Sequence, residues 1–332
     1  MNCFRLGFFR FFGILLAGAV LLAAAGCVRD RTLKVLEIDY VRGDGAPLRD
    51  QLGAASSQVG TLPGGERVEV LAKRTRWFQV RLASGRTGWV HSRFLASPKV
   101  YDQFRRLAEE SAALPSQGKA HIQRESNLHV EPGRNTDTFY SLAEREEVEV
   151  LAHRLAERTD RPGNSGNMNQ GGAGSAEQGS AEVEVKGFED WFLVRASAGR
   201  TGWLRESLLD LSPPLEIARY NEGLRVRGWF VLFEEHDKGE VHPWYLWVTI
   251  RPRAGLPFDY DEFRVFVWNP RMSRYETSYR QRNLIGFYPV QVGSRETPAG
   301  QIPTFSLQLE DEKGTRFRKN YAMNGRIVRP ES

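Results

Sequence analysis

A stretch of thirteen residues occurs in two similar copies in this chain of 332 residues, and the pair constrains its fold more than any other feature. Residues Trp77–Trp89 read WFQVRLASGRTGW and residues Trp191–Trp203 read WFLVRASAGRTGW, with nine of the thirteen positions identical. Each copy combines an alternating strand, a turn that contains glycine, and a second strand that begins Thr-Gly-Trp. Two copies of such a pattern predict a duplicated module rather than one large domain.

The duplication extends upstream and sets the boundaries of the two modules. Residues Glu66–Arg74 match Glu146–Arg154 at an offset of 80 with seven of nine identities, whereas the tryptophan stretch matches at an offset of 114. The difference of 34 predicts an insertion in the second copy, at about residues 155–188. Because this stretch is rich in Gly, Ser and Asn and poor in large apolar residues, we expect a disordered loop between two strands. The modules are expected at 33–96 and 119–211.

Both copies resemble the bacterial SH3-like domain. The resemblance rests on Leu48-Arg49-Asp50 and Asn127–Val130, on the apolar strand before each first tryptophan, and on the pairs Gly88-Trp89 and Gly202-Trp203. The first copy departs from the family pattern because it lacks the Asn. The resemblance covers about half the chain and implies a small antiparallel β-barrel, often a targeting or cell-wall-binding unit. It also implies that Gly88, Trp89, Gly202 and Trp203 are the structural signature of each barrel.

Residues 1–26 have the features of a processing signal. Arg5 and Arg10 precede an apolar run that is too short for a convincing transmembrane helix. The run ends Ala24-Ala25-Gly26-Cys27, which resembles a bacterial lipobox and implies that Cys27 is lipidated and anchors the chain to a membrane through a tether at 27–32. An ordinary secretory signal or an uncleaved anchor would also fit. Because Val28 stands where Asp would retain the protein at the inner membrane, we expect the periplasmic face of the envelope, at the outer membrane in a double-membraned cell.

Removal of this signal excludes several classes of function. Cys3 would be lost with it, so the mature chain would hold no disulfide, no CxxC zinc site and no cysteine nucleophile. The loss of Arg5 and Arg10 lowers the net charge from +5 to +3, too small an excess to indicate a nucleic-acid binder. The chain has no phosphate loop and no HExxH motif. We therefore expect no small-molecule cofactor, no metal and no catalytic residue.

The remaining segments are a connector and a third domain. Ser97-Pro98 is typical of a helix start, and residues 97–118 are expected to form a helical connector that packs on a barrel, with a partner-binding helix as the alternative. Ser212-Pro213-Pro214 reads as a stiff hinge. Residues 215–332 alternate apolar and polar residues in seven or eight segments without a convincing helix. Together these features predict a mainly all-β protein, with two SH3-like antiparallel barrels, a connecting helix, and a C-terminal antiparallel β-sandwich or bent-sheet domain.

Two acidic groups in the C-terminal domain are candidates for chemistry. Residues 234–242 contain Glu234, Glu235, His236, Asp237, Glu240 and His242, which are metal-capable side chains without a ligand spacing known to us. A solvated hairpin loop is the interpretation we favour for them. Asp259, Asp261 and Glu262 could supply paired carboxylates for glycoside hydrolysis, although a polar turn after Pro257 is the simpler interpretation.

The candidate binding residues are aromatic and basic. Trp77 and Trp191 could stack on sugar rings, and Arg86 and Arg200 could pair with carboxylates of a peptide, although tryptophans in a barrel often belong to the core. A basic strip in the C-terminal domain could bind an anion or form a solvated sheet face: Arg264, Arg271, Arg274, Arg280 and Arg282.

These observations favour a non-enzymatic, lipid-anchored protein of the cell envelope that binds peptidoglycan or an envelope protein through its two SH3-like modules. One alternative is a scaffold lipoprotein whose C-terminal β-domain binds a protein partner. A second is a cell-wall hydrolase with an unrecognised catalytic domain, whose activity would require His236 and His242.

Overall fold

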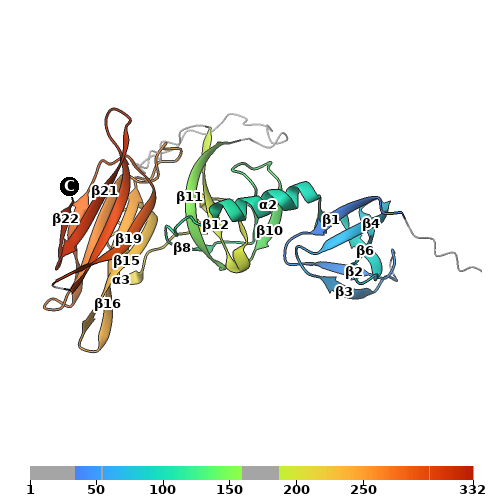
Figure 1. The fold of residues 1–332 in the computed structure, drawn as a ribbon, viewed down its shortest axis with the longest axis horizontal. Coiled ribbons are helices and arrows are strands. Elements are labelled where there is room, and N and C mark those ends of the chain that lie inside the picture. Colours follow the sequence, from blue (N-terminus) through green and yellow to red (C-terminus); the bar gives the residue numbers. More distant parts are fainter. Residues whose placement is uncertain (1–33, 54, 159–186, 299, 332) are drawn as a thin grey trace, which may run out of the picture.

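A computed structural model describes residues 34–53, 55–158, 187–298 and 300–331. Three β units follow one another along the long axis, and helix α2 lies across the middle unit (Figure 1). The expected signal segment, Cys27 and residues 159–186 of the expected insertion lie outside the described residues. None of the helices in the described ranges is long and apolar enough to cross a membrane.

The first unit is a small antiparallel barrel with the strand order β3-β2-β6-β5-β4-β1-β7. Alternate residues of the strands, such as Leu48, Val70, Val80 and Val90, are fully buried in its core. Its strands are β1 (Glu37–Val41), β2 (Ala46–Arg49), β3 (Gln58–Leu62), β4 (Arg67–Arg74), β5 (Trp77–Arg81), β6 (Thr87–His91) and β7 (Leu95–Ala96), with the 3-10 turn η1 (Ser92–Phe94). From sequence alone, Gly43, Gly45 and Pro47 indicate only a turn-rich break where β2 lies, because β2 is short and contains Pro47.

The second unit repeats this strand order position by position, as β10-β9-β13-β12-β11-β8-β14. Its elements are β8 (Lys119–Ile122), β9 (Ser126–His129), β10 (Thr138–Leu142), β11 (Glu147–Glu157), β12 (Phe188–Arg195), η2 (Ser197–Gly199), β13 (Thr201–Arg205), η3 (Glu206–Leu208) and β14 (Leu209–Asp210). β11 and β12 remain paired as far as Glu157 and Phe188. The described ends of the expected insertion are therefore ladder residues, which corrects the expectation of disorder at those positions.

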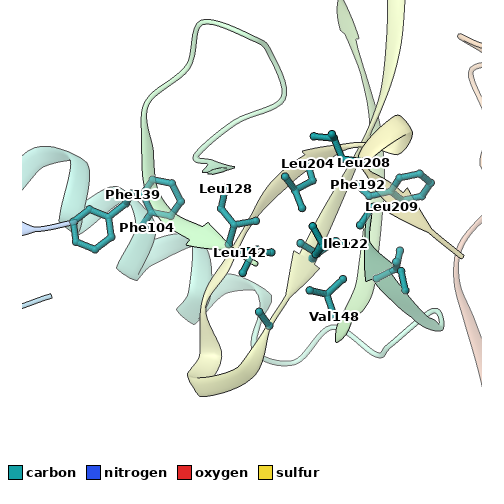
Figure 2. Packing of buried hydrophobic residues seen from close by; sticks show 14 of the residues in the cluster. Phe104, Ile122, Leu128, Phe139, Leu142, Val148, Phe192, Leu204, Leu208 and Leu209 are labelled. Atoms are coloured by element: carbon teal, nitrogen blue, oxygen red, sulfur yellow. The ribbon is translucent and has the colours of Figure 1, made fainter. Parts of the chain in front are cut away.

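Helix α2 (Pro98–Ser111) belongs to the core of the second barrel. Val100 and Phe104 are buried in the same cluster as Leu128, Phe139 and Leu204. Figure 2 shows Phe104 beside Phe139 at one end of this cluster, and the two ring centroids lie 6.0 Å apart. Because the helix closes one end of the barrel, it cannot leave without exposing apolar core.

Polar contacts and one aromatic stack join the two barrels. The Arg42 guanidinium donates to the carbonyls of Leu95 and Thr138, at 2.7 Å each, and so bridges the first barrel to β10. Tyr40 stacks on Tyr101 of α2 with ring centroids 4.0 Å apart.

The C-terminal domain is an antiparallel sandwich of two four-stranded sheets. One sheet holds β15 (Arg225–Asp237), β16 (Glu240–Ile250), β17 (Glu262–Asn269) and β18 (Arg274–Gln281); the other holds β19 (Gly286–Thr297), β20 (Gly300–Glu310), β21 (Arg316–Asn324) and β22 (Ile327–Pro330). Side chains of both sheets, among them Leu246, Phe263 and Leu307, share one buried cluster. The prediction of a mainly all-β protein is confirmed.

Two details of this domain differ from expectation. A one-turn helix, α3 (Leu215–Ala218), precedes β15. Residues 234–237 and 240–242 are strand residues rather than a loop, with Glu235 paired to His242 and only Lys238-Gly239 in the turn. Both turn residues have positive φ, which suits a tight two-residue hairpin.

Candidate functional site

The outer face of the first barrel presents aromatic and basic side chains from three adjacent strands. Along β5 and β6, Trp77 and Trp89 alternate with the core residues Val80 and Val90 and therefore point outward. The register pairs Trp77 with His91, and Trp89 with both Gln79 and Arg49. Because cross-strand partners lie on one face of a sheet, these side chains form a continuous surface, here called the first tryptophan face.

The geometry of this face leaves its aromatic rings accessible. Trp77 and Trp89 are half-buried. Trp77 meets His91 edge to face at 5.2 Å, and the Arg49 guanidinium carbon lies 5.9 Å from the Trp77 ring centroid. Arg49 is held by a 2.8 Å hydrogen bond to Ser56 Oγ. Such a surface can stack on a sugar ring or a flat peptide group while donating hydrogen bonds beside it.

The glycine of each signature is required by close packing. A Cβ on Gly88 would lie 2.6 Å from Leu48 Cδ1, and a Cβ on Gly202 would lie 2.7 Å from Leu128 Cβ. Glycine lets β6 and β13 approach the neighbouring strand, and the tryptophan that follows is thereby placed on the outer face.

The equivalent face of the second barrel is closed. Trp191 and Trp203 are 1% and 4% exposed, and they form a buried cluster with Leu193 against which Leu107 of α2 packs. A groove of about 450 Å³ remains between α2 and Trp203. Trp191 offers no ring face to a ligand in this arrangement, because helix packing turns the stacking residue expected from sequence into a core residue.

The two turn arginines also differ. Arg86 is exposed, as a binding residue would be. Arg200 is only 17% exposed and lies 3.2 Å from Asp44 of the first barrel and 2.5 Å from Glu146. It also donates to the Ser141 carbonyl at 2.9 Å. Arg200 therefore joins the two barrels and has no free donors to offer a ligand carboxylate.

A buried charge network between the second barrel and the C-terminal domain was not found from sequence. His153 Nε2 lies 2.8 Å from Asp190 Oδ1, and His153 Nδ1 lies 2.7 Å from Asp259 Oδ1 across the domain boundary. Arg227 of β15, 1% exposed, lies 3.2 Å from Asp190. The signal in the sequence was a difference between the copies, because Lys73 and Arg76 of the first barrel correspond to His153 and Asp190.

The protonation of this network follows from its contacts. Burial alone would lower the pKa of His153, but the hydrogen bonds to Asp190 and Asp259 outweigh burial and raise that pKa above its usual value. Burial opposes ionisation of Asp190, yet His153 and Arg227 hold the pKa of its carboxyl well below the usual range. The two hydrogen bonds thus favour the protonated form of His153, a cation between two carboxylates.

The carboxylates once considered for catalysis are engaged in ion pairs. Asp261 lies 2.5 Å from Arg251, and Glu262 lies 2.7 Å from Arg280. Glu222 pairs with Arg264, Arg280 and Arg282, so three arginines of the expected basic strip are engaged in ion pairs within the domain. Among residues that the structure describes, no group of three or more His, Cys, Asp or Glu side chains is arranged to hold a metal ion.

Comparisons with known proteins concern mainly the first barrel. Residues 44–96 match the family described as the bacterial SH3 domain. No curated protein matches the chain. Among solved structures, NlpC1 from Trichomonas vaginalis is 11% identical with a TM-score of 0.18, over 54% of this chain and 47% of that one. NlpC2 from Trichomonas vaginalis is 12% identical with a TM-score of 0.17, over 52% and 47%. The chain spans about half the length of these two structures, and likenesses of this size carry no argument.

Proposed function

We propose that this protein is a non-enzymatic binding protein of the bacterial cell envelope, and that the first tryptophan face binds peptidoglycan. The supporting observation is the outward-facing, half-buried pair Trp77 and Trp89 within the segment that matches the bacterial SH3 domain. The second unit is proposed to be a second SH3-like copy, because it repeats the strand order of the first. In this proposal it serves as a stem rather than as a second receptor, since α2 closes its equivalent face.

The proposed location of this protein is a membrane of the cell envelope. Lipidation of Cys27 would hold the chain at a membrane, on the periplasmic face and at the outer membrane of a double-membraned cell. The order of units then places the first barrel next to the anchor and the sandwich farthest from it along the chain.

The test is co-sedimentation of the full chain with purified cell-wall sacculi. We expect Trp77→Ala and Trp89→Ala each to weaken binding about tenfold, because loss of a stacked aromatic ring costs about 1–2 kcal/mol. Phe317→Ala is the matched control, since it removes an aromatic ring that is 43% exposed on the sandwich. Circular dichroism would check that each variant is folded. Absence of sedimentation by the unmodified chain would overturn the proposal.

A second candidate function is assembly with a protein partner through the C-terminal domain. Eight large apolar side chains of this domain are more than a third exposed: Leu215, Val231, Phe233, Val241, Met272, Val292, Phe317 and Ile327. If a partner binds there, Phe233→Asp should abolish its capture while leaving sacculus binding unchanged. Release of soluble muropeptides, lost on substitution of His236 and His242, would instead support the hydrolase alternative.

A further inference from the structure

Arginines surround Trp77 on the first tryptophan face. Arg74 is the cross-strand partner of Trp77, and Arg49 lies beside the Trp77 ring. Arg76 immediately precedes Trp77 in the turn between β4 and β5. One arginine thus lies beside the ring, one is opposite Trp77 in the ladder, and one precedes it in the chain.

A fourth arginine lies at the same end of the barrel. Arg93 follows β6, and its turn is joined to the β4–β5 turn by a 2.8 Å hydrogen bond from Ser92 N to the Arg76 carbonyl. Arg74, Arg76 and Arg93 are exposed, and Arg49 is half-buried. Arg49, Arg74, Arg76 and Arg93 are here called the arginine rim.

The rim lacks neutralising carboxylates. Within the described ranges, none of its four guanidinium groups lies within 4.0 Å of a carboxylate oxygen. On the same barrel Arg81 pairs with Glu69 at 2.8 Å. Like charges at one end of a barrel repel one another, and an anion bound among them would relieve that repulsion.

The charge balance of the two barrels agrees with this local picture. Residues 34–96 hold ten Lys and Arg against six Asp and Glu, a net charge of +4. Residues 119–158 and 187–211 of the second barrel hold nine against twelve, a net charge of −3. The barrel with the open aromatic face is therefore the basic one, whereas the barrel with the closed face is acidic.

We propose that the first tryptophan face recognises clustered anionic oxygens, of carboxylate or phosphate groups, on the polymer that it binds. The arginine rim would hold these oxygens in charge-assisted hydrogen bonds, while Trp77 and Trp89 stack on adjacent sugar or peptide surfaces. This inference rests on the proposed function, because it concerns the same face. Clustered anionic oxygens are the chemical feature of the ligand that this face would recognise.

The test uses the full chain and four preparations of sacculi. One is untreated, one has its carboxylates amidated with carbodiimide and ammonium, one has its phosphodiester-linked polymers removed with hydrofluoric acid, and one has received both treatments. The variant Arg74→Gln/Arg76→Gln removes two exposed rim charges. The control variant Arg318→Gln/Arg329→Gln removes two exposed charges from the sandwich.

We expect the rim variant to bind untreated sacculi at least tenfold more weakly, because each lost charge-assisted hydrogen bond weakens binding by about that factor. The control variant should bind like the unmodified chain. Binding should also weaken as ionic strength rises. Loss on amidation alone would identify carboxylates, and loss on hydrofluoric acid treatment alone would identify phosphates.

Two results would overturn this inference while leaving the proposed function intact. One is binding to doubly treated sacculi at full strength, with no effect of the rim variant. The other is equally tight binding of an arbitrary DNA duplex, which would show that the face does not discriminate among polyanions. Failure of the unmodified chain to bind any preparation would instead overturn the proposed function itself.

Discussion

Replacement of His153 by alanine tests whether the buried charge network holds the second barrel and the C-terminal domain together. His153 is 3% exposed in its side chain and contacts one carboxylate from each domain. Its removal leaves Asp190 and Asp259 facing a cavity without their shared cation. Breaking a buried charge pair in this way costs about 3–5 kcal/mol. If the second barrel and the C-terminal domain unfold together, each kcal/mol of lost stability lowers the melting temperature by about 2–4 °C.

The contribution of this charge network to stability should depend on pH. Because the folded-state pKa of His153 is raised, its contribution to stability is complete below about pH 6.5, the usual pKa of histidine, and is lost as pH rises through the folded value. The depressed pKa of Asp190 adds stability that is complete above about pH 4 and is lost at lower pH. This network should therefore contribute most to stability between these limits, and His153→Ala should remove the alkaline loss.

Differential scanning calorimetry at several pH values measures both effects. Lys73→Ala is the matched control, because Lys73 occupies the corresponding position of the first barrel in an exposed ion pair with Glu37. That pair should contribute less than about 1 kcal/mol. A loss of under about 1 kcal/mol in His153→Ala, with an unchanged pH profile, would refute the reasoning.

Three further predictions concern packing and ionisation. Gly88→Ala should destabilise the first barrel by about 1–3 kcal/mol in urea unfolding, because its Cβ would collide with Leu48, whereas Gly293→Ala, whose Cβ would meet nothing closer than 3.6 Å, should change little. Val290 N donates to the buried Gln117 Oε1 at 2.7 Å, so Gln117→Ala should lower the free energy of unfolding by about 1–3 kcal/mol and speed hydrogen exchange at Val290 N. The control Gln301→Ala, at an exposed position, should leave that amide protected. Burial, assisted by Glu37, raises the pKa of Asp39 to about 6, so the folded state binds this proton more tightly and stability falls as pH rises from about 4 to 6. Asp39→Asn should therefore raise the melting temperature at pH 8 and not at pH 4, and a rise at both would contradict this account.

Local sequence patterns were sufficient for the fold class and for most strands. Alternating residues such as Phe78, Gln79 and Val80 specify a half-buried strand regardless of what packs on it. The glycine of the Gly-Trp pair is explained by local packing, because only glycine fits where the neighbouring strand lies within contact distance. Strand β2 was missed because it is four residues long and its alternation is too brief to distinguish from a turn.

Long-range packing was not readable in the same way. The residues of 234–242 are polar, which indicated a loop, yet the ladder of β15 and β16 carries them to the turn at Lys238. His153 and Asp259 are separated by 106 residues in the chain, and no sequence pattern around either residue indicates that the two are in contact. Such contacts depend on how finished domains dock.

The repeated tryptophan stretch shows the effects of both local sequence pattern and long-range packing. By itself the sequence determined that residues 77–89 and 191–203 form the same pair of strands, since nine shared positions impose the same alternation and the same glycine. Only the tertiary structure decided that Trp77 stays accessible whereas Trp191 is buried, because α2 packs on the tryptophan face of the second barrel and leaves that of the first uncovered. Gln79 of the first barrel corresponds to Leu193 of the second, and this change agrees with the difference in burial. An apolar side chain is favourable at this position only where another element packs over it and excludes water.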